Sequence, residues 1–522
     1  MRSAYQQGQY QKAFKDLESS YLKTDKDSAL LYLMQKAKLL HSMGQYSTAR
    51  EQLRKALNLK SELYTRSVTK AIFAGLTNDQ NSKYRGQIYE ISMLYFYQAV
   101  SSLKLAQRGY RLIKTPKGDQ QKPLSQDEKR KLLFDARAAI VAWDSFYQTL
   151  NNETDEKSLF KDDLLLKIFG AQVHQLLPAR SDKVIALDLY IDALDTLDKQ
   201  GMTFASFNEK YDDYFKAVYN DTKKEKNVAT ENYQDLRTYL LSRAYSLAQK
   251  YSKFRLKKLK KRYPMAKVEK NVANVHLIFE EGIVSPLEQQ DFSYTIGSAF
   301  DSIEDPATRR IVTAFGSAVI TYFAMGPLGL AFQTRSGNTR IYTSHNLGTT
   351  LTKEAGIEFS MPLVSKKNLS SAKANIYRVE VYQGDKKVDE NKLILAQPVS
   401  DLAYQLSNEL ASKSYVKLGA RLALKHVIAI IAAFTTYNSL KEKGGDFYAR
   451  AVAFAQYVVS AKAIKATEPS DTRQWNTLPG RLYVQDLKLS KGSYQLKLFN
   501  GVNMIRTIAL DVDKETFASL SL

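Results

Sequence analysis

The motif Gly-Gln-Tyr-x-x-Ala occurs twice near the amino terminus of this 522-residue chain, and it limits what the first segment can fold into. Glycine allows the backbone to make a tight turn. The tyrosine can fill the groove between two antiparallel helices, and the alanine lets the second helix approach closely. We therefore predict two helical hairpins, whose structural residues are Gly8, Tyr10 and Ala13 in the first copy and Gly44, Tyr46 and Ala49 in the second.

The distance between the two copies indicates the kind of repeat. Gly8 and Gly44 are 36 residues apart, close to the tetratricopeptide period of about 34. Apolar residues around the second copy recur at the i, i+3, i+4 and i+7 spacing of amphipathic helices. We expect tetratricopeptide-like repeats over residues 1–113, and the alternative is a plain array of helical hairpins.

The sequence pattern changes twice further along the chain. Turn-forming and polar residues at 114–126 predict a loop or boundary, and amphipathic helical patterns resume over 127–262. After Pro264 short β-type runs begin, so we expect an α+β domain over 265–522. At roughly 150 residues per domain, the length also favours several domains. The expected fold is a multidomain α+β chain with an amino-terminal helical repeat array and a mixed, β-rich carboxy-terminal domain.

Two groups of strands around a helical block are expected in the carboxy-terminal domain. The strands lie within 272–400 and 481–512, and the helical block occupies 399–466. The individual runs are 272–279, 356–364, 376–382, 393–396, 481–489, 494–499 and 504–512. Turn signals at Lys491-Gly492 and Asn500-Gly501 predict that the last three strands are antiparallel.

Two apolar segments stand out in this half of the chain. Residues 311–332 carry no charged side chain and have the length of a membrane span, but Gly326-Pro327 would interrupt a helix. We prefer a buried helix or an apolar hairpin against a partner, and membrane insertion stays open. Residues 426–437 are apolar nearly all round, which predicts a core helix.

No signature of a reaction is present in the sequence. The absence of cysteine excludes disulfides, thiolate metal sites and cysteine nucleophiles. The five histidines lie far apart, and none is at metal-ligand spacing from another. The common nucleotide-binding, hydrolase and zinc-protease motifs are absent. We expect no metal, no cofactor and no catalytic residue.

Charge is the strongest compositional signal. The net charge of +22 favours anionic partners. Residues 250–270 contain ten Lys or Arg and one Glu, and their helical phase leaves one partly apolar face and one basic face. The candidate contacts to a polyanion or an anionic membrane surface are Lys257, Lys258, Lys260, Lys261 and Arg262. A solvated helix end is the alternative interpretation.

Several separated motifs carry a family resemblance. They are Leu76-Thr77-Asn78-Asp79, Tyr84-Arg85-Gly86 with Tyr89-Glu90, Glu281-Gly282-Ile283-Val284-Ser285-Pro286, and Asp471-Thr472-Arg473-Gln474-Trp475-Asn476-Thr477-Leu478-Pro479. In this order they resemble an uncharacterised family of tetratricopeptide-containing Gram-negative envelope proteins, usually lipoproteins. The resemblance spans nearly the whole chain.

The resemblance implies export to the periplasm and attachment to the outer membrane through a lipidated cysteine. Since this chain has no cysteine, we expect that the signal and lipidation site are missing from it or that this member is not lipidated; a cytoplasmic location is the alternative. The implied partners are envelope lipoproteins that resemble activators of penicillin-binding proteins or curli-secretion channel proteins. The family offers no catalytic residue to carry over.

The motif residues divide into two expected roles. Asp471, Arg473 and Trp475 suit capping, pairing and anchoring, so we expect a packing role. A loop rich in polar and aromatic residues between helices resembles a contact surface, and its candidate partner-binding residues are Asn78, Asp79, Tyr84, Arg85 and Tyr89.

Three functional hypotheses follow. The first is a non-enzymatic envelope scaffold that binds proteins through its helical repeats and can form homo-oligomers. The second is binding of a polyanion or an anionic membrane through residues 250–270, with nucleic acid as the partner if the chain is cytoplasmic. The third is an enzyme acting on cell-wall glycan through Glu280 and Glu281. Neighbouring residues of a strand point to opposite faces, which argues against this pair flanking one bond.

Overall fold

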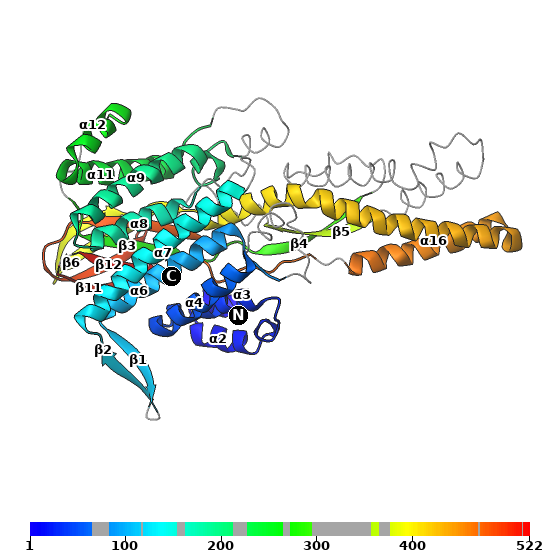
Figure 1. Ribbon diagram of the computed structural model, residues 1–522, viewed down its shortest axis with the longest axis horizontal. Helices are drawn as coiled ribbons and strands as arrows, with labels where there is room; N and C mark the ends of the chain where they lie inside the picture. The colour runs from blue at the N-terminus through cyan, green and yellow to red at the C-terminus, as the bar shows by residue number, and fades with distance from the viewer. Residues whose placement is uncertain are drawn as a thin grey trace.

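The computed structural model describes residues 1–64, 83–115, 118–153, 162–211, 227–264, 272–294, 357–364, 376–467, 470–513 and 515–521. Helices and two sheets form a body, and a long helical arm projects from one end of it (Figure 1). The expected order, helices in the amino-terminal part and strands in the carboxy-terminal part, is confirmed.

The two copies of the glycine motif form the same turn. Helices α1 (Arg2–Gln6) and α2 (Tyr10–Glu18) flank Gly8, while α3 (Ala29–Ser42) and α4 (Tyr46–Leu63) flank Gly44. Both glycines are left-handed, with φ +70° and +74°. The Gly8 amide bonds to the Tyr5 carbonyl as the Gly44 amide bonds to the His41 carbonyl, and the next amide in each copy reaches one residue further back. This is the Schellman motif, which satisfies the last carbonyls of a helix.

Packing beside the two turns is equivalent as well. The Tyr5 and Tyr10 rings lie 5.2 Å apart, and the His41 and Tyr46 rings, at the equivalent positions, are also 5.2 Å apart. Ala13 and Ala49 are completely buried. The glycine, aromatic and alanine positions thus have the roles that the sequence predicts for them.

A series of helices extends from the repeat hairpins. They are α6 (Ile88–Arg108), α7 (Gln126–Glu153), α8 (Leu164–Leu176), α9 (Arg180–Gln200), α11 (Glu231–Tyr251) and α12 (Lys253–Arg262). The loop expected at 114–126 is wrong in part, because β1 (Tyr110–Thr115) and β2 (Gly118–Pro123) pair there as an antiparallel hairpin. Gly109, at φ +76°, ends α6 just before this hairpin.

Two four-stranded sheets lie in the body. The first has the order β12 (Thr516–Ser521), β3 (Val275–Glu281), β9 (Arg481–Leu487), β8 (Ile394–Gln397), and the second has the order β11 (Asn503–Val512), β10 (Gly492–Asn500), β6 (Tyr377–Gln383), β7 (Lys386–Lys392). All neighbours are antiparallel except β12 and β3. A separate two-stranded ribbon joins β4 (Leu287–Tyr294) to β5 (Ile357–Val364).

The first sheet lies between the helices and the second sheet. Helices α6, α8 and α11 contact its edge strands β12 and β8. On the other face, the ring of Phe279 in β3 lies 4.8 Å from that of Tyr377 in β6, which in turn lies 5.2 Å from that of Tyr483 in β9. Strand β3 is buried along nearly its whole length, as a strand covered on both faces should be.

The expected helical block is confirmed as α16 (Val399–Ala466), but it is not a core element along its whole length. Gly445, at φ +79° and ψ 166°, breaks it into two limbs that pack as a hairpin. Its first residues join the main core, and the rest forms the arm (Figure 1). The prediction of a core helix at 426–437 therefore holds only in part: Ala429, Ala433 and Tyr437 are buried in a small core of the arm, whereas Ile428 is 59% exposed.

One hydrophobic core joins the two halves of the body. It contains buried residues from Leu30 to Ala518 and is continuous across the boundaries expected near 114–126 and 262–265. The apolar segment 311–332 lies outside the described residues. Of the helices that the structure describes, none combines the length and apolar character that a membrane span requires.

Candidate functional site

Three of the four sequence motifs that carry the resemblance contribute to one buried junction between the helices and the first sheet; the fourth, at 76–79, lies outside the described residues. Glu90 at the start of α6 is the centre of this junction. One carboxylate oxygen accepts hydrogen bonds from the Tyr84 hydroxyl at 2.5 Å and the Gln87 amide at 2.7 Å, and the other accepts from the Trp475 amide at 2.7 Å. The Glu90 side chain closes a capping box with Gln87 and also fixes a segment 385 residues away.

Gln474 connects this junction to the segment after β3. Its amide nitrogen donates to the Tyr89 hydroxyl at 2.9 Å and to the Ser285 carbonyl at 3.1 Å, while its oxygen accepts from the Leu287 amide at 2.9 Å. Gln474 is 2% exposed. One buried amide side chain therefore contacts two of the other motif segments and uses its donors and its acceptor to do so.

Asp471, Arg473 and Trp475 have the packing roles that the sequence predicts. The Arg473 guanidinium binds both Asp471 oxygens, at 2.8 and 2.6 Å, and lies 5.6 Å from the Tyr84 ring. Trp475 is completely buried, and its indole nitrogen donates to Thr477 at 3.1 Å. The bidentate pair shapes the turn, and the indole fills the space under it.

The two tyrosines of the expected contact surface lie inside the fold. Tyr84 and Tyr89 are 7% and 2% exposed, and both hydroxyls bond within the junction, so they are unavailable to a partner in this fold. Arg85 is half-buried. Asn78 and Asp79 lie outside the described residues. The motif is polar and aromatic because it is an interior hydrogen-bonding segment.

The protonation of Glu90 gives a test of the junction. Burial raises the pKa of Glu90 from its ordinary 4.5 to about 7, although the Trp475, Tyr84 and Gln87 donors lower it. The folded state then holds a proton that the unfolded state releases between these values. This contribution to stability is complete below pH 4.5 and lost as the pH rises through 7; between pH 5 and 8 it amounts to about 2–3 kcal/mol.

Urea unfolding at pH 5 and pH 8 measures this contribution. We expect the free energy of unfolding of the wild type to fall by more than that of the Glu90→Gln variant over this range, and the difference between the two falls is the Glu90 contribution. An equal pH dependence in both proteins would contradict the assignment to Glu90.

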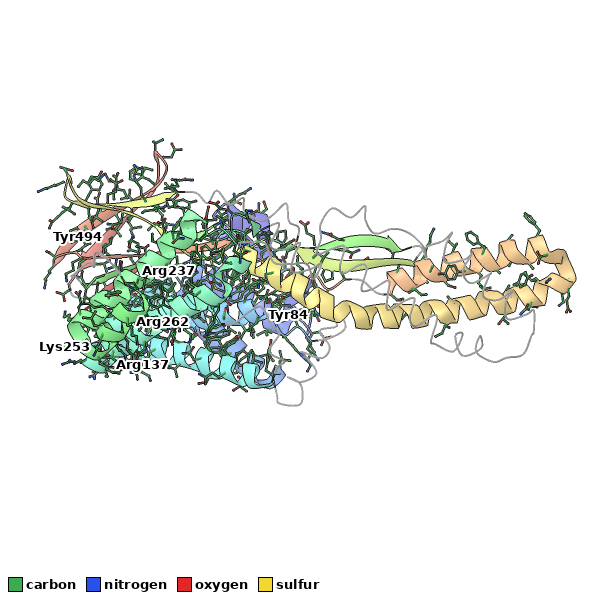
Figure 2. The ribbon with its side chains drawn as sticks, turned by 90° about the horizontal axis from the view of Figure 1, so that it is seen from above. Tyr84, Arg137, Arg237, Lys253, Arg262 and Tyr494 are labelled. Atoms are coloured by element: carbon green, nitrogen blue, oxygen red, sulfur yellow. The ribbon has the colours of Figure 1, made fainter. Side chains whose placement is uncertain are left out.

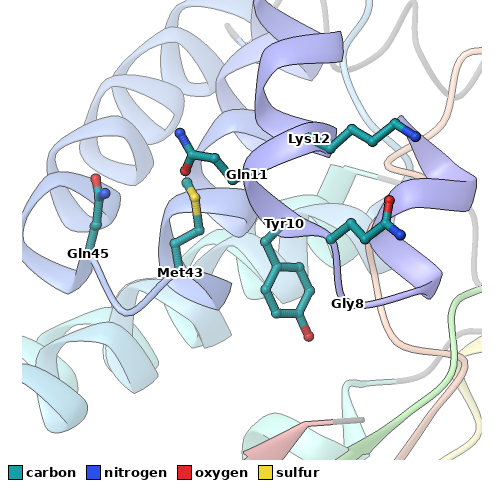
Figure 3. A pocket seen from close by; sticks show the side chains of 7 residues that line it. Gly8, Tyr10, Gln11, Lys12, Met43 and Gln45 are labelled. Atoms are coloured by element: carbon teal, nitrogen blue, oxygen red, sulfur yellow. The ribbon is translucent and has the colours of Figure 1, made fainter.

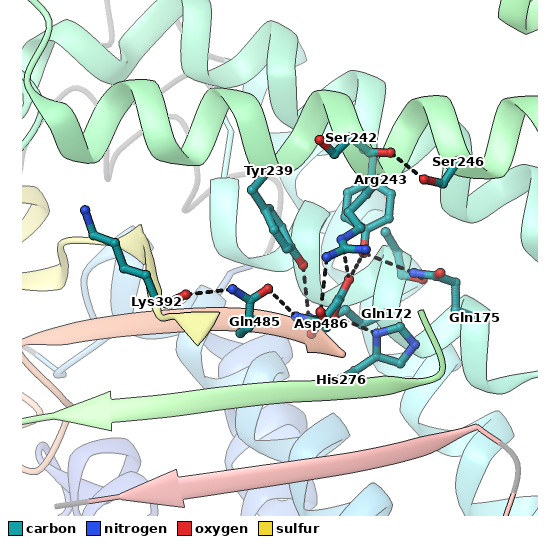
Figure 4. Close-up of polar contacts among 12 residues, drawn as sticks. Gln172, Gln175, Tyr239, Ser242, Arg243, Ser246, His276, Lys392, Gln485 and Asp486 are labelled. Carbon is teal, nitrogen blue, oxygen red and sulfur yellow. Dashed lines mark hydrogen bonds and ion pairs between the residues drawn. The ribbon is translucent and has the colours of Figure 1, made fainter. Parts of the chain in front are cut away.

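A second buried cluster, centred on Asp486 in β9, joins three helices to the sheet (Figure 4). Its carboxylate lies 2.8 Å from Nδ1 of His276, 3.0 Å from Gln172 of α8 and 3.3 Å from Nε of Arg243 in α11. Tyr190 of α9 also donates to it at 3.3 Å. Burial alone would raise the pKa of Asp486, but His276 and Arg243 lower it to about 2. The His276 and Asp486 side chains are completely buried, which fits a structural tie better than a site open to substrate.

A buried ion pair connects the repeat hairpins to the same sheet. Lys38 of α3 and Glu280 of β3 are 2.6 Å apart, and Tyr97 donates to the same carboxylate at 3.1 Å. Glu281 instead contacts Tyr377 and Tyr483 in the aromatic layer between the sheets, at 2.8 and 2.9 Å. Glu280 and Glu281 thus lie on opposite faces of β3 and do not face a common substrate position.

The sequence carries a signal for these clusters. His276 and Asp486 are ionisable residues inside runs that otherwise have the pattern of buried strands, and Glu280 directly follows one of these runs. Such residues need partners when they are buried. The identity of those partners comes only from the fold, because Lys38 lies 242 residues from Glu280.

A hollow of about 610 Å³ lies between the turns of the two repeat hairpins (Figure 3). It is lined by Gly8, Gln9, Tyr10, Gln11, Lys12, Met43 and Gln45. Gln11 and Lys12 are exposed. Within the described part of the chain, neither side chain takes part in a hydrogen bond or ion pair. Their polar groups are therefore open to a ligand.

In the basic helix α12, some charged side chains form ion pairs within the fold and others are exposed to solvent. Arg262, one of the candidate polyanion contacts, pairs with Asp195 at 2.7 Å, so its charge is partly neutralised within the fold. Lys257, Lys258, Lys260 and Lys261 are exposed, and none has an ion-pair partner in the ranges that the structure covers. Figure 2 shows Lys253 and Arg262 at the end of the molecule opposite the arm.

The arm has its own small core and an exposed aromatic tip. Ala429, Ala433 and Tyr437 of the first limb cluster with Ala449, Ala453 and Tyr457 of the second, the same Ala-x-x-x-Ala-x-x-x-Tyr pattern in both. At the turn, the Tyr437 hydroxyl donates to Asp446 at 2.5 Å. Beyond it, Phe447 is 88% exposed and Tyr448 54%.

Among the described residues, no three His, Asp or Glu side chains converge in a way that could hold a metal ion. Comparison of the chain with protein-family models, with curated proteins and with solved structures found no match.

Proposed function

We propose that this chain is a non-enzymatic scaffold of the bacterial cell envelope that binds other envelope proteins through its helical hairpins. The observation that carries the proposal is the arm. Its alanine and tyrosine core is separate from the main core, so this part of the arm is held by its own two limbs and not by packing on the body. A helix rises about 1.5 Å per residue, so the two limbs of the arm extend well beyond the body (Figure 1). We infer that the arm reaches another molecule.

The tip has the character of a binding hot spot. Phe447 and Tyr448 leave two large aromatic groups in water, next to a glycine pair that makes the turn. Exposed apolar surface of this kind favours a protein partner that covers it, and aromatic residues dominate the energetics of such contacts. The partner then offers an apolar pocket that is deep enough for one aromatic ring.

The repeat hairpins supply a second contact surface. We propose that they are tetratricopeptide-like units, which their equivalent turns, aromatic pairs and buried alanines support. The hollow between their turns presents Gln11 and Lys12 to solvent. A hydrogen-bonding chain segment of a partner, such as a lipoprotein of the classes named by the resemblance, suits this surface.

The envelope location rests on the motifs. Segments around residues 84–90, 281–287 and 471–479 are far apart in sequence, and the first two both hydrogen-bond to the third in the junction. Motifs that make one another's hydrogen bonds form a fold signature and are not independent coincidences. This supports the resemblance to the envelope family.

The tip can be tested by differential capture from bacterial envelope extracts. The full chain is compared with the tip variant Phe447→Ser/Tyr448→Ser. A second variant, Ile428→Ser/Val459→Ser, is the shaft control: it removes exposed apolar side chains from the same arm but away from the tip, since Ile428 is 59% exposed and Val459 68%. We expect one partner whose yield falls about tenfold or more with the tip variant only.

Two results would contradict the proposed function. One is the same set of captured proteins for all three chains, and the other is an equal loss with the shaft control. Thermal unfolding of the variants provides the folding control. Substitutions at exposed positions usually change stability by about 0.5 kcal/mol or less.

A further inference from the structure

Two ion pairs fix the rotation of α12 against α9. Arg255 binds both oxygens of Asp188, at 2.5 and 2.7 Å, and Arg262 pairs with Asp195 at 2.7 Å. The arginines are seven residues apart on one helix, and so are the aspartates on the other. Seven residues are about two helical turns, so the two bridges lie along one seam. Leu259 is buried, 3% exposed, on the inner side of the helix.

The outer face of α12 combines cations with one exposed aromatic ring. Phe254 is 66% exposed, and Lys257, Lys258 and Lys261 follow it at i+3, i+4 and i+7, so they surround it on the same face. The Lys258 ammonium lies 4.6 Å from the Phe254 ring centroid. No acidic residue occurs between 253 and 264.

We propose that this face binds a membrane surface rich in anionic phospholipids. Each lysine near such a surface contributes roughly 1 kcal/mol of attraction, and an aromatic ring inserts between the lipid headgroups. Apolar residues set among lysines are typical of helices that lie in a membrane interface.

The same observations favour lipid over nucleic acid. Arginine is the side chain best suited to bidentate recognition of phosphates and bases, and both arginines of α12 are engaged by aspartates. The remaining groups are point charges around a single ring, on a helix at the periphery of the body (Figure 1). Lysine ammonium groups suit a fluid array of headgroups, which needs no fixed register.

This contact is independent of the proposed scaffold function, but the two are compatible in space. Helix α12 and the tip of the arm lie at opposite ends of the long axis of the molecule (Figure 1). A chain bound to a membrane through α12 therefore keeps the tip of its arm far from the bound face.

Vesicle co-sedimentation of the full chain tests the proposal. Vesicles with 30% phosphatidylglycerol in phosphatidylcholine are compared with pure phosphatidylcholine. Lys257→Glu/Lys258→Glu/Lys261→Glu should weaken partition to the anionic vesicles by about 100-fold or more. The control Lys15→Glu/Lys26→Glu/Lys122→Glu makes the same charge change at three exposed lysines outside α12, and it should keep most of the binding.

A tryptophan at position 254 reports insertion directly. Trp143 and Trp475 are completely buried, so added vesicles should leave their emission unchanged. In Phe254→Trp, anionic vesicles should shift the added emission to the blue, and brominated lipid should quench it. This readout holds even if a glutamate variant folds poorly.

Four results would overturn the proposal. They are equal binding to neutral vesicles, an equal loss in the control triple variant, no blue shift at position 254, and tighter binding to duplex or single-stranded DNA than to anionic vesicles at the same salt concentration. The last result would assign α12 to nucleic acid.

Discussion

Replacing Lys38 by methionine is expected to lower the free energy of unfolding by about 3–5 kcal/mol, because it leaves a buried carboxylate without its counter-charge. Lys38 is 1% exposed and its ammonium lies 2.6 Å from Glu280. It also lies 4.3 Å from the Tyr97 ring centroid. Burial alone would lower the pKa of Lys38, but Glu280 raises it well above its ordinary value, so Lys38 keeps its charge. After the substitution, the Tyr97 hydroxyl is the one side-chain group among the described residues that still donates to Glu280.

The double variant Lys38→Met/Glu280→Met separates charge from packing. It removes both charges and retains apolar volume, so we expect it to recover most of the stability that the single variant loses. Lys55→Met is the control, since Lys55 pairs with Glu51 on the exposed surface and should cost about 0.5 kcal/mol or less. Urea unfolding measures the free energy of unfolding of the wild type, the single variant, the double variant and the control. A double variant as unstable as the single one would show that the loss comes from packing.

Local patterns in the sequence predicted the elements whose cause is local. The glycine motif forms its turn from residues within one hairpin, and its two copies are equivalent because each satisfies its own helix end. Helix α16 has the expected outer bounds of 399 and 466, although Gly445 breaks it into two limbs between them. Strands β3, β6, β9 and β10 begin within three residues of their expected starts.

Elements with a non-local cause were missed. Strand β7 is polar and mostly exposed, and it exists because it pairs with β6 at the edge of the second sheet. Strand β12 lies beyond the last expected run and pairs in parallel with β3, more than two hundred residues earlier in the chain. Neither strand has an amphipathic pattern of its own, so tertiary pairing decides their structure.

The prediction that Tyr84 and Tyr89 form a contact surface was wrong for a similar reason, because it considered only neighbours in the sequence. Tyr84 and Tyr89 resemble a contact surface when only their neighbours are considered, because polar and aromatic residues favour both interfaces and buried networks. Their role is decided by Gln474 and Trp475, which reach Tyr89 and Glu90 only in the fold. The exposure of the candidate lysines of α12 could be predicted, because the sequence of this helix alone shows which residues share a face. The compensation of Arg262 by Asp195 is again a tertiary property.

Replacing Trp475 by alanine is expected to lower the free energy of unfolding by about 3–5 kcal/mol, the range for truncating a buried tryptophan. The indole is completely buried, lies 5.9 Å from the Tyr97 ring and donates to Thr477. Its backbone amide holds Glu90, so a collapse around the cavity would also disturb the junction. Urea unfolding followed by circular dichroism measures the loss without depending on the missing fluorophore.

Two further variants show whether Trp475 acts through the junction. Trp475→Phe keeps the ring but loses the bond to Thr477, so it should cost about 1 kcal/mol from that bond and leave the junction closed. Trp143→Ala removes the other fully buried tryptophan, which packs on Tyr147 within the helices. Hydrogen exchange should then rise around Glu90 and Gln474 in Trp475→Ala, and around α7 in Trp143→Ala. The same exchange pattern in both alanine variants would mean that the helices and the sheet unfold as one unit, and that the junction does not hold them together as a distinct contact.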